Sequence, residues 1–177
     1  SEGALDDSAV ICRHLDGIAL AIELAAARVP LLGIAGVRAR LGDNLKLLSE
    51  SAPLTWLRHQ TMEAALEWSH SLLDEPTRVA LRRLGIFTGG FSFEGAARVT
   101  GNGEGEDQDV LNELAVLVDR SLLLVEQTAK RTRYRMLEPM REFALARLQA
   151  AGETDAWRRR HALAMVAVCR LAVRERN

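Results

Sequence analysis

Apolar residues recur at helical spacing over most of the chain, and this pattern predicts a mainly α fold. In the first third, the pattern predicts helices over residues 7–15, 19–28, 34–42 and 44–48. The helix over 19–28 is apolar nearly all round, so we expect it to lie in a core. Gly17 ends the first of these helices, Pro30 ends the second, and a loop around Pro53 follows the last.

In the middle of the chain, the spacing of apolar residues predicts several helices and then changes to the alternation that is typical of strands. Helices are predicted over residues 61–73, 92–99 and 109–119. Another helix is predicted between the first two of these, with its N-cap at Asp74 and its end at Gly89. A Gly-rich acidic loop is predicted at 101–108. The spacing then changes, and two short strands over 122–126 and 133–136 predict one β-hairpin. A helix over 138–150 follows, with Gly152 as its stop.

Helices followed by a two-stranded wing are the element order of a winged helix-turn-helix. We therefore predict a mainly α chain in three parts. These are a small helical bundle (1–58), a winged-helix domain with one β-hairpin (59–152) and a C-terminal helix (153–177). Ser, Pro and Thr cluster at 49–59, where we expect a hinge between two rigid parts.

The last helix is predicted over residues 155–173. It carries an arginine run at 158–160 and an apolar body that includes Leu163, Val166 and Leu171. One helix cannot bury such a face alone, so the favoured interpretation is the first helix of a following helical-repeat region. A helix lying on a membrane surface is the alternative.

Composition narrows the class of protein. The 177 residues carry 23 basic and 24 acidic side chains, so general affinity for nucleic acid is not indicated. An apolar content of 48% excludes disorder, and no apolar run is long enough to span a membrane. Two cysteines and no secretory pattern favour a reducing, cytoplasmic location. Because the chain begins with Ser1, we expect a fragment.

No catalytic or metal-binding pattern is present. The chain lacks the phosphate-binding loops GxxxxGKS, GxxxxGKT and GxGxxG, and its densest glycines lie among acidic residues that would repel phosphate. The four histidines are scattered without ligand spacing. We therefore expect this chain not to be an enzyme by itself, and to hold no metal.

A winged helix raises the possibility of DNA binding. The groove-reading helix would be 109–119, but its charged positions are acidic: Asp109, Glu113 and Asp119. Such a helix needs Arg or Lys to contact phosphates and base edges. The features that favour DNA are the cations of this region, which are Arg120, Lys130, Arg131, Arg133 and Arg135. Direct DNA binding is the less favoured hypothesis.

Five segments, in order, resemble one family of signalling ATPases. They are 12–28 (CRHLDGIALAIELAAAR), 60–69 (QTMEAALEWS), 84–91 (LGIFTGGF), 117–122 (LVDRSL) and 134–144 (YRMLEPMREFA). The first is similar to the GLPL-motif segment of STAND-class ATPases, which include NB-ARC proteins and bacterial LuxR-like and AfsR-like regulators. The next three are similar to segments of that family's winged-helix domain, and the last lies at the position of its MHD-type motif. The resemblance covers about residues 7–165.

The resemblance implies the regulatory half of a molecular switch. In the family, an upstream P-loop domain binds ATP or ADP, and the helical and winged-helix domains close over the nucleotide at rest. Nucleotide exchange opens them, and the protein oligomerises or releases an effector, often a DNA-binding domain. The implied partners are therefore the P-loop domain upstream in the same polypeptide, and helical-repeat and effector domains downstream.

The resemblance also assigns candidate nucleotide contacts. Gly17 and Leu20 match the GLPL motif, whereas Ala19 stands at the position of the proline that lies against adenine. Leu137 and Glu138 stand at the positions of the MHD histidine and aspartate. Leucine cannot hydrogen-bond to a phosphate, so a variant sensor is implied. The alternative is structural, with Gly17 breaking a helix and Leu137 packing in the core.

The sequence therefore favours a non-catalytic segment of a bacterial STAND-type transcriptional regulator, which couples the nucleotide state of the upstream domain to output. Two alternatives remain open. One is a winged-helix transcription factor that binds DNA by itself, and the other is a protein-interaction module that does not respond to nucleotide.

Overall fold

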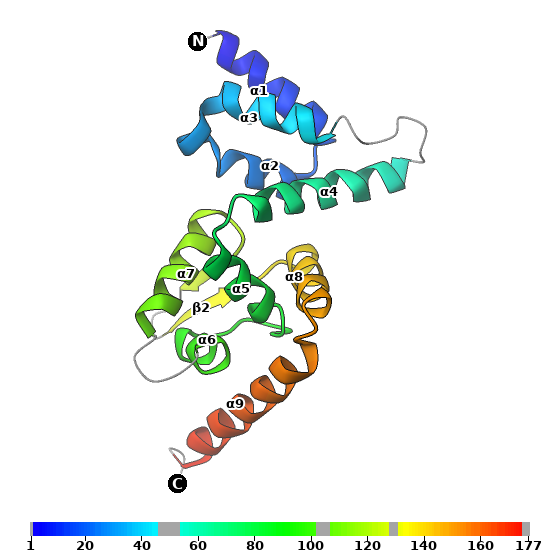
Figure 1. Cartoon of the computed structure of the whole chain (residues 1–177). Helices are drawn as coiled ribbons and strands as arrows, with labels where there is room; N and C mark the ends of the chain where they lie inside the picture. Colours follow the sequence, from blue (N-terminus) through cyan, green and yellow to red (C-terminus); the bar gives the residue numbers. More distant parts are fainter. Residues whose placement is uncertain (1, 46–53, 102–106, 128–130, 175–177) are drawn as a thin grey trace. The chain divides into compact units, whose positions relative to one another are not determined.

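The computed structural model describes residues 2–45, 54–101, 107–127 and 131–174, which form nine helices and a two-stranded antiparallel sheet (Figure 1). They divide into two compact units, Ser1–Leu73 and Asp74–Asn177. The predicted fold class, mainly α with a β-hairpin and a C-terminal helix, is confirmed.

The first unit is a bundle of helices. They are α1 (Glu2–His14), α2 (Ala19–Ala26), α3 (Val29–Leu45) and α4 (Leu54–Ser71). Helix α1 packs on α3, and α2 packs on α4. As the sequence predicts for an apolar helix, α2 contributes Ala21, Leu24 and Ala25 to the buried core. Other core side chains include Ile11, Leu15, Val37, Leu41, Leu66 and Trp68.

Pro30 begins a helix rather than ending one, which corrects the expectation from the sequence. Helix α2 already ends at Ala26, and Pro30 lies in the first turn of α3, where no intrahelical partner awaits its missing N–H. Beyond Pro30 the sequence predicts one or two short helices over 34–42 and 44–48. In the structure residues 34–45 belong to the single element α3, which is interrupted earlier, at Gly33, and residues 46–48 lie outside the described part of the chain. A φ of 67° and a ψ of 163° at Gly33 interrupt the helical conformation there.

Helix α4 belongs to the first unit, because it packs on α2 and α3. It starts at Leu54, earlier than the predicted start at 61. The division of the chain therefore falls after Leu73 and not at the predicted boundary between 58 and 59. Of the predicted hinge over 49–59, residues 49–53 lie outside the described part of the chain, and the rest is helical.

The second unit begins with a helix whose start the sequence predicts. Helices α5 (Glu75–Leu84), α6 (Phe93–Thr100), α7 (Asp107–Asp119) and α8 (Glu138–Ala150) surround the core. The Asp74 carboxylate caps α5 by accepting from the Thr77 amide at 3.1 Å, and the Ser92 hydroxyl caps α6 in the same way. Helix α5 packs on α6, α7 and α8.

The wing is an antiparallel hairpin of β1 (Leu124–Gln127) and β2 (Thr132–Arg135), with Val125 opposite Tyr134. It starts two residues later than predicted. Ser121 turns the chain with a φ of 58°, and Leu122 and Leu123 are buried before the strand begins. On its other edge, Tyr134 exchanges backbone hydrogen bonds of 2.8 and 2.9 Å with Phe91.

Helix α9 (Thr154–Arg174) packs on α6 and α8 and belongs to the second unit. Trp157 and Ala164 are buried on this side, whereas Leu163 and Val166 are exposed. The predicted separate part over 153–177 is therefore continuous with the winged helix over its first turns. Within the described residues, no single helix is long and apolar enough to cross a membrane.

Candidate functional site

Helix α7 holds the position of the groove-reading helix, and its exposed surface is acidic. Asp107, Asp109 and Asp119 are exposed. The same surface includes Leu111 and Val116, which are 43% and 39% exposed. The buried side of the helix carries Val110, Leu114 and Leu117. This surface offers apolar contact and negative charge, and neither suits the phosphate backbone of DNA.

The wing carries the cations that the sequence singles out. Arg131, Arg133 and Arg135 are all exposed, so the hairpin does bring these candidates together. Arg133 donates to the Gly90 carbonyl, Arg135 lies 2.8 Å from the Glu126 carboxylate, and Arg131 lies near Glu94. Lys130 lies outside the described residues, and Arg120 is half-buried beyond the end of α7.

The predicted GLPL-like residues lie in the turn between α1 and α2 and at the start of α2. Asp16 and Gly17 both adopt the left-handed conformation, with φ of 52° and 66°. A Cβ at Gly17 would meet no atom within 4 Å, so the conformation rather than space favours glycine here. Ala19, the first residue of α2, is exposed, and Leu20 is half-buried.

Two features of this turn bear on ligand binding. The Thr61 hydroxyl of α4 donates to the Asp16 carboxylate at 2.8 Å and so fixes the turn on the bundle. Ile18 stands at the N-cap of α2 and makes no side-chain cap hydrogen bond. The backbone N–H groups at the start of α2 are therefore left without a side-chain cap from this residue.

The MHD-like residues begin α8. Leu137 is the N-cap residue and is half-buried, and Glu138 is the first residue of the helix and is exposed. Glu138 lies 2.5 Å from Arg141, and this hydrogen bond lowers the pKa of the Glu138 carboxyl. The carboxylate therefore already has a cationic partner on its own helix. Leu137 and Glu138 lie in the second unit, and Gly17, Ala19 and Leu20 lie in the first.

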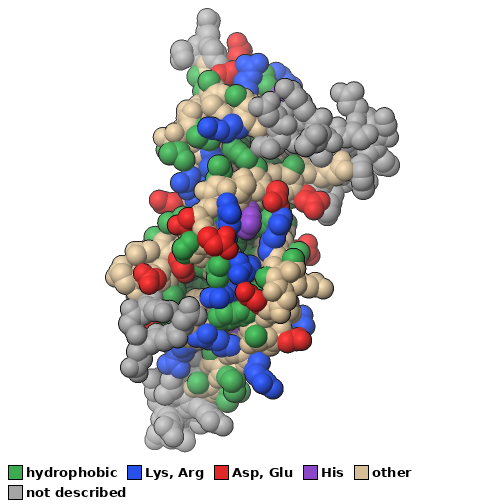
Figure 2. All heavy atoms as spheres, in the orientation of Figure 1, with side chains coloured by type: hydrophobic (Ala, Val, Ile, Leu, Met, Phe, Trp, Pro, Cys, Tyr) green, Lys and Arg blue, Asp and Glu red, His purple; other side chains and the backbone are tan. Residues whose placement is uncertain are grey.

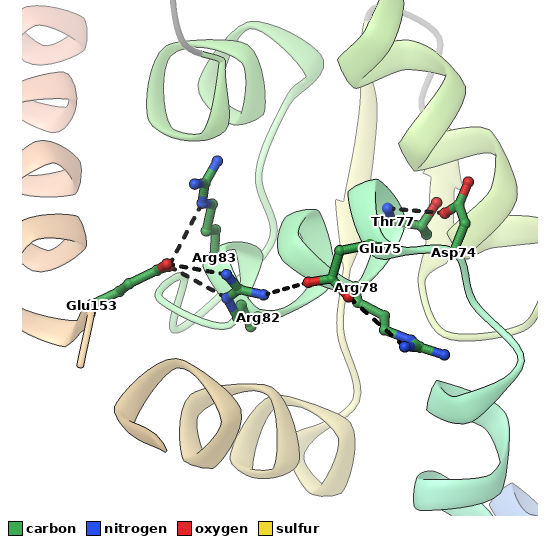
Figure 3. A network of polar contacts seen from close by, with 7 residues as sticks. All are labelled: Asp74, Glu75, Thr77, Arg78, Arg82, Arg83 and Glu153. Atoms are coloured by element: carbon green, nitrogen blue, oxygen red, sulfur yellow. Dashed lines mark hydrogen bonds and ion pairs between the residues drawn. The ribbon is translucent and has the colours of Figure 1, made fainter. Parts of the chain in front are cut away.

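A polar network that the sequence does not predict joins α5 to the turn before α9 (Figure 3). Arg82 donates to both oxygens of Glu153, at 3.0 and 3.3 Å, and Arg83 lies 3.8 Å from the same carboxylate. The Arg83 guanidinium also stacks on Trp157, 4.1 Å from the ring centroid. Burial lowers the pKa of Arg83, whereas the hydrogen bond to Glu153 raises the pKa of Arg82.

A cavity of about 520 Å³ is the second feature that the sequence does not reveal. It lies among the wing, the start of α6 and helix α9, and its lining includes Phe93, Arg131 and Met165. These residues are distant in sequence and share no periodic pattern, so only the fold brings them together. No cluster of potential metal ligands occurs among the residues that the structure describes.

Comparison with known proteins agrees with the fold. Residues 73–149 match the family described as the winged helix-turn-helix domain. The chain is 43% identical over 147 residues to an uncharacterized protein of Mycobacterium tuberculosis, covering 82% of this chain and 37% of that protein. It is 41% identical over 145 residues to a second protein of that species, provisionally named an HTH-type transcriptional regulator, covering 82% of this chain and 16% of the relative.

A protein of Mycobacterium bovis with the same provisional name matches equally well. The chain spans well under half the length of these curated relatives. The element order, the wing and the family match agree on one conclusion: residues 73–149 form a winged helix-turn-helix domain.

Proposed function

We propose that this chain is a non-catalytic regulatory segment of a bacterial transcriptional regulator, and that its winged helix packs against protein rather than reading DNA. The observation that carries the proposal is the surface of α7, where Asp107, Asp109 and Asp119 are exposed beside Leu111 and Val116. A helix of this composition repels a duplex and suits a protein partner. The relatives provisionally named as HTH-type transcriptional regulators support the regulatory part.

The segment is proposed to respond to ATP or ADP bound by a P-loop domain upstream in the same polypeptide, and to act on helical-repeat and effector domains downstream. The resemblance to STAND-class ATPases supports this step. In the first unit, Gly17, Ala19 and Leu20 are the proposed adenine contacts. In the second unit, Leu137 and Glu138 are the proposed sensor positions. The start of α2, without a side-chain cap at Ile18, suits contact with an electronegative ligand.

The first test is to sequence the complete reading frame that encodes this chain. A GxxxxGKS or GxxxxGKT loop upstream, with an acidic strand about 70 residues later, is expected. A start codon immediately before Ser1 would overturn the nucleotide coupling and leave DNA or protein binding as the question.

The second test uses the complete polypeptide and the variant Ala19→Pro. Proline fits the first position of a helix, and Ile18 has the extended conformation that a residue before proline prefers, with φ of −72° and ψ of 111°. The larger ring should tighten ADP binding, measured by calorimetry, whereas the control Ala19→Ser should not. If Ala19→Pro and Ala19→Ser bind ADP equally, Ala19 does not contact the nucleotide.

Direct DNA binding is the second candidate. The winged helix-turn-helix family match, the HTH-type names of the relatives and the three exposed arginines of the wing favour it. A salt titration separates the candidates, because the affinity of a DNA-binding protein falls steeply as salt rises. The packing module should show no saturable binding to duplex DNA at physiological salt. A protein-interaction module that does not respond to nucleotide, the other alternative, would bind its partner equally with ATP, with ADP or without nucleotide.

A further inference from the structure

The wing and helix α6 enclose a groove, which forms because the backbone turns away from the wing at the start of α6. Phe91 pairs with Tyr134 of β2, but two residues later the chain turns into α6 at Phe93 and leaves the strand. The space that opens between Thr132 and the first turn of α6 is the cavity of about 520 Å³, and Met165 of α9 contributes to its lining. A volume of roughly 300–1,000 Å³ is typical of pockets that hold ligands.

Part of the lining is aromatic and apolar. Phe87 and Phe91 stack with their ring centroids 4.6 Å apart and form a buried wall of the groove. Phe93 and Met165 are half-buried, so part of each side chain remains accessible. These four side chains can accept bulky apolar groups from a partner.

The apolar surface continues from the groove along α9. Ala162 lies three residues before Met165 and four before Val166, so the three side chains are neighbours on the helix surface. Val166 and Leu163 are 48% and 66% exposed. Figure 2 shows hydrophobic and basic side chains interspersed on the part of the surface that α9 forms. The accessible apolar area is therefore an elongated stripe rather than a closed pocket.

The charge beside the stripe is mainly positive. Arg131 and Arg133 line the groove, and Arg158 and Arg159 are exposed on α9. Gly90 allows Arg133 to lie across the groove wall, because a Cβ at position 90 would be 3.2 Å from the Arg133 Nε. Glu94 is the one acidic side chain among the lining residues, and it lies near Arg131 and Arg98, which offset its charge.

We propose that this groove, with the α9 stripe, binds an acidic protein segment that carries bulky apolar side chains. Carboxylates would pair with the arginines on either side, and the apolar side chains would enter between the wing and α6. The aromatic and methionine lining favours a peptide over DNA, because a duplex backbone has no apolar groups to bury there. This proposal gives the proposed regulatory segment a binding partner, an acidic protein segment, and this binding requires no nucleotide.

The test measures fluorescence anisotropy of labelled 16-residue peptides in the presence of the 177-residue chain. The probe peptide contains Leu at helical spacing and Glu elsewhere, and a matched peptide replaces every Glu by Lys. The variant Arg131→Ala removes a groove cation, and Arg135→Ala removes a wing cation that does not line the groove. Circular dichroism establishes that both variants keep the wild-type fold.

The Glu/Leu peptide is expected to bind saturably, and Arg131→Ala is expected to weaken this binding about tenfold, whereas Arg135→Ala changes it less than twofold. The Lys/Leu peptide is expected not to bind. Equal binding of both peptides, equal effects of the two variants, or no binding of the Glu/Leu peptide would each overturn the proposal.

A labelled 20-base-pair duplex distinguishes the DNA-binding alternative. Saturable duplex binding that depends equally on Arg131 and Arg135, with no binding of the Glu/Leu peptide, would also overturn the proposal and assign the wing to DNA. None of these measurements involves ATP or ADP. Failure of the groove proposal is therefore distinguishable from failure of nucleotide coupling, which the Ala19→Pro experiment tests separately.

Discussion

Arg82 and Glu153 meet through a two-point contact, in which Nη2 and Nε of the guanidinium donate to the two carboxylate oxygens at 3.0 and 3.3 Å. Arg82 lies on α5, and Glu153 lies in the turn between α8 and α9, where Gly152 adopts a φ of 71°. The Arg82 and Glu153 side chains are 19% and 29% exposed. This contact fixes the point at which the chain leaves α8 and enters α9.

Replacing Glu153 by Gln should therefore destabilise the second unit. The neutral amide cannot match both guanidinium N–H groups, and Arg82 and Arg83 lose their shared carboxylate. We expect a loss of about 1–2 kcal/mol in the free energy of unfolding, since hydrogen bonds to charged groups contribute ~1.5–3 kcal/mol and solvent access reduces this. Urea unfolding followed by circular dichroism measures the loss. Glu126→Gln, which breaks an exposed pair with Arg135, is the control and should have little effect.

The stability of the Glu153→Gln variant should also depend less on acidic pH than that of the wild-type chain. The hydrogen bond from Arg82 holds the pKa of Glu153 below its ordinary value. A lowered carboxyl pKa contributes stability that is present above the ordinary pKa, roughly 4.5, and is lost as the pH falls through the lowered pKa. The wild-type chain should therefore lose more stability than Glu153→Gln as the pH falls below about 4.5. Parallel curves of unfolding free energy against pH would contradict this role for Glu153.

Gly85 allows α5 and α8 to approach closely, and two glycine variants test this. A Cβ built at Gly85 lies 2.9 Å from the Ala144 Cβ, whereas one built at Gly89 meets no atom within 4 Å. Both glycines have backbone conformations open to alanine, since neither has a positive φ. Gly85→Ala should cost about 1–3 kcal/mol by overpacking, and Gly89→Ala should be neutral or slightly stabilising. Thermal unfolding distinguishes the two. Equal melting temperatures would mean that α8 shifts to accommodate the methyl group.

Much of the fold could be predicted because its signals are local. Residues close together in the sequence determine the caps at Asp74 and Ser92, the change from helical to alternating spacing at the wing, and the helix over 138–150. The position of Pro30 is ambiguous in the sequence, because proline is compatible both with the end of one helix and with the first turn of the next.

The polar and apolar contacts of α9 could not be predicted in the same way. Glu153 reaches Arg82 across 71 positions, and Arg160 donates to backbone carbonyls at Arg98 and Gly101. Nothing in a local pattern distinguishes these arginines from others on a solvated helix face. The groove residues could not be predicted for the same reason, because Phe93, Arg131 and Met165 become neighbours only after the wing and α9 have packed.

The candidate site residues followed from motifs rather than from geometry. The wing arginines could be placed together, since a hairpin brings alternate positions onto one surface. The internal partners of Arg133 and Arg135 could not be foreseen, because Gly90 and Glu126 reach them through the tertiary and cross-strand pairing of the wing. The acidity of α7 was visible in the sequence and remains the strongest argument about DNA.

Trp157 anchors α9 to the winged helix, and its removal should separate the two. The ring is buried, and the Arg83 and Arg160 guanidinium carbons lie 4.1 and 5.0 Å from its centroid. Trp157→Ala should cost about 3–5 kcal/mol, as truncation of a large buried aromatic does. Trp157→Phe keeps an aromatic ring against both cations and should cost less, about 1–2 kcal/mol.

Urea unfolding and limited trypsin digestion together measure the effect of these Trp157 variants. Trypsin should cut Trp157→Ala at the run Arg158–Arg160 much faster than wild type, because the first turns of α9 no longer pack on α6. Leu163→Ala is the matched control, since Leu163 is exposed on the same helix and should leave both stability and the cleavage rate nearly unchanged. If Trp157→Ala and Leu163→Ala are cleaved at the same rate, α9 is held by contacts other than the arginine-stacked tryptophan.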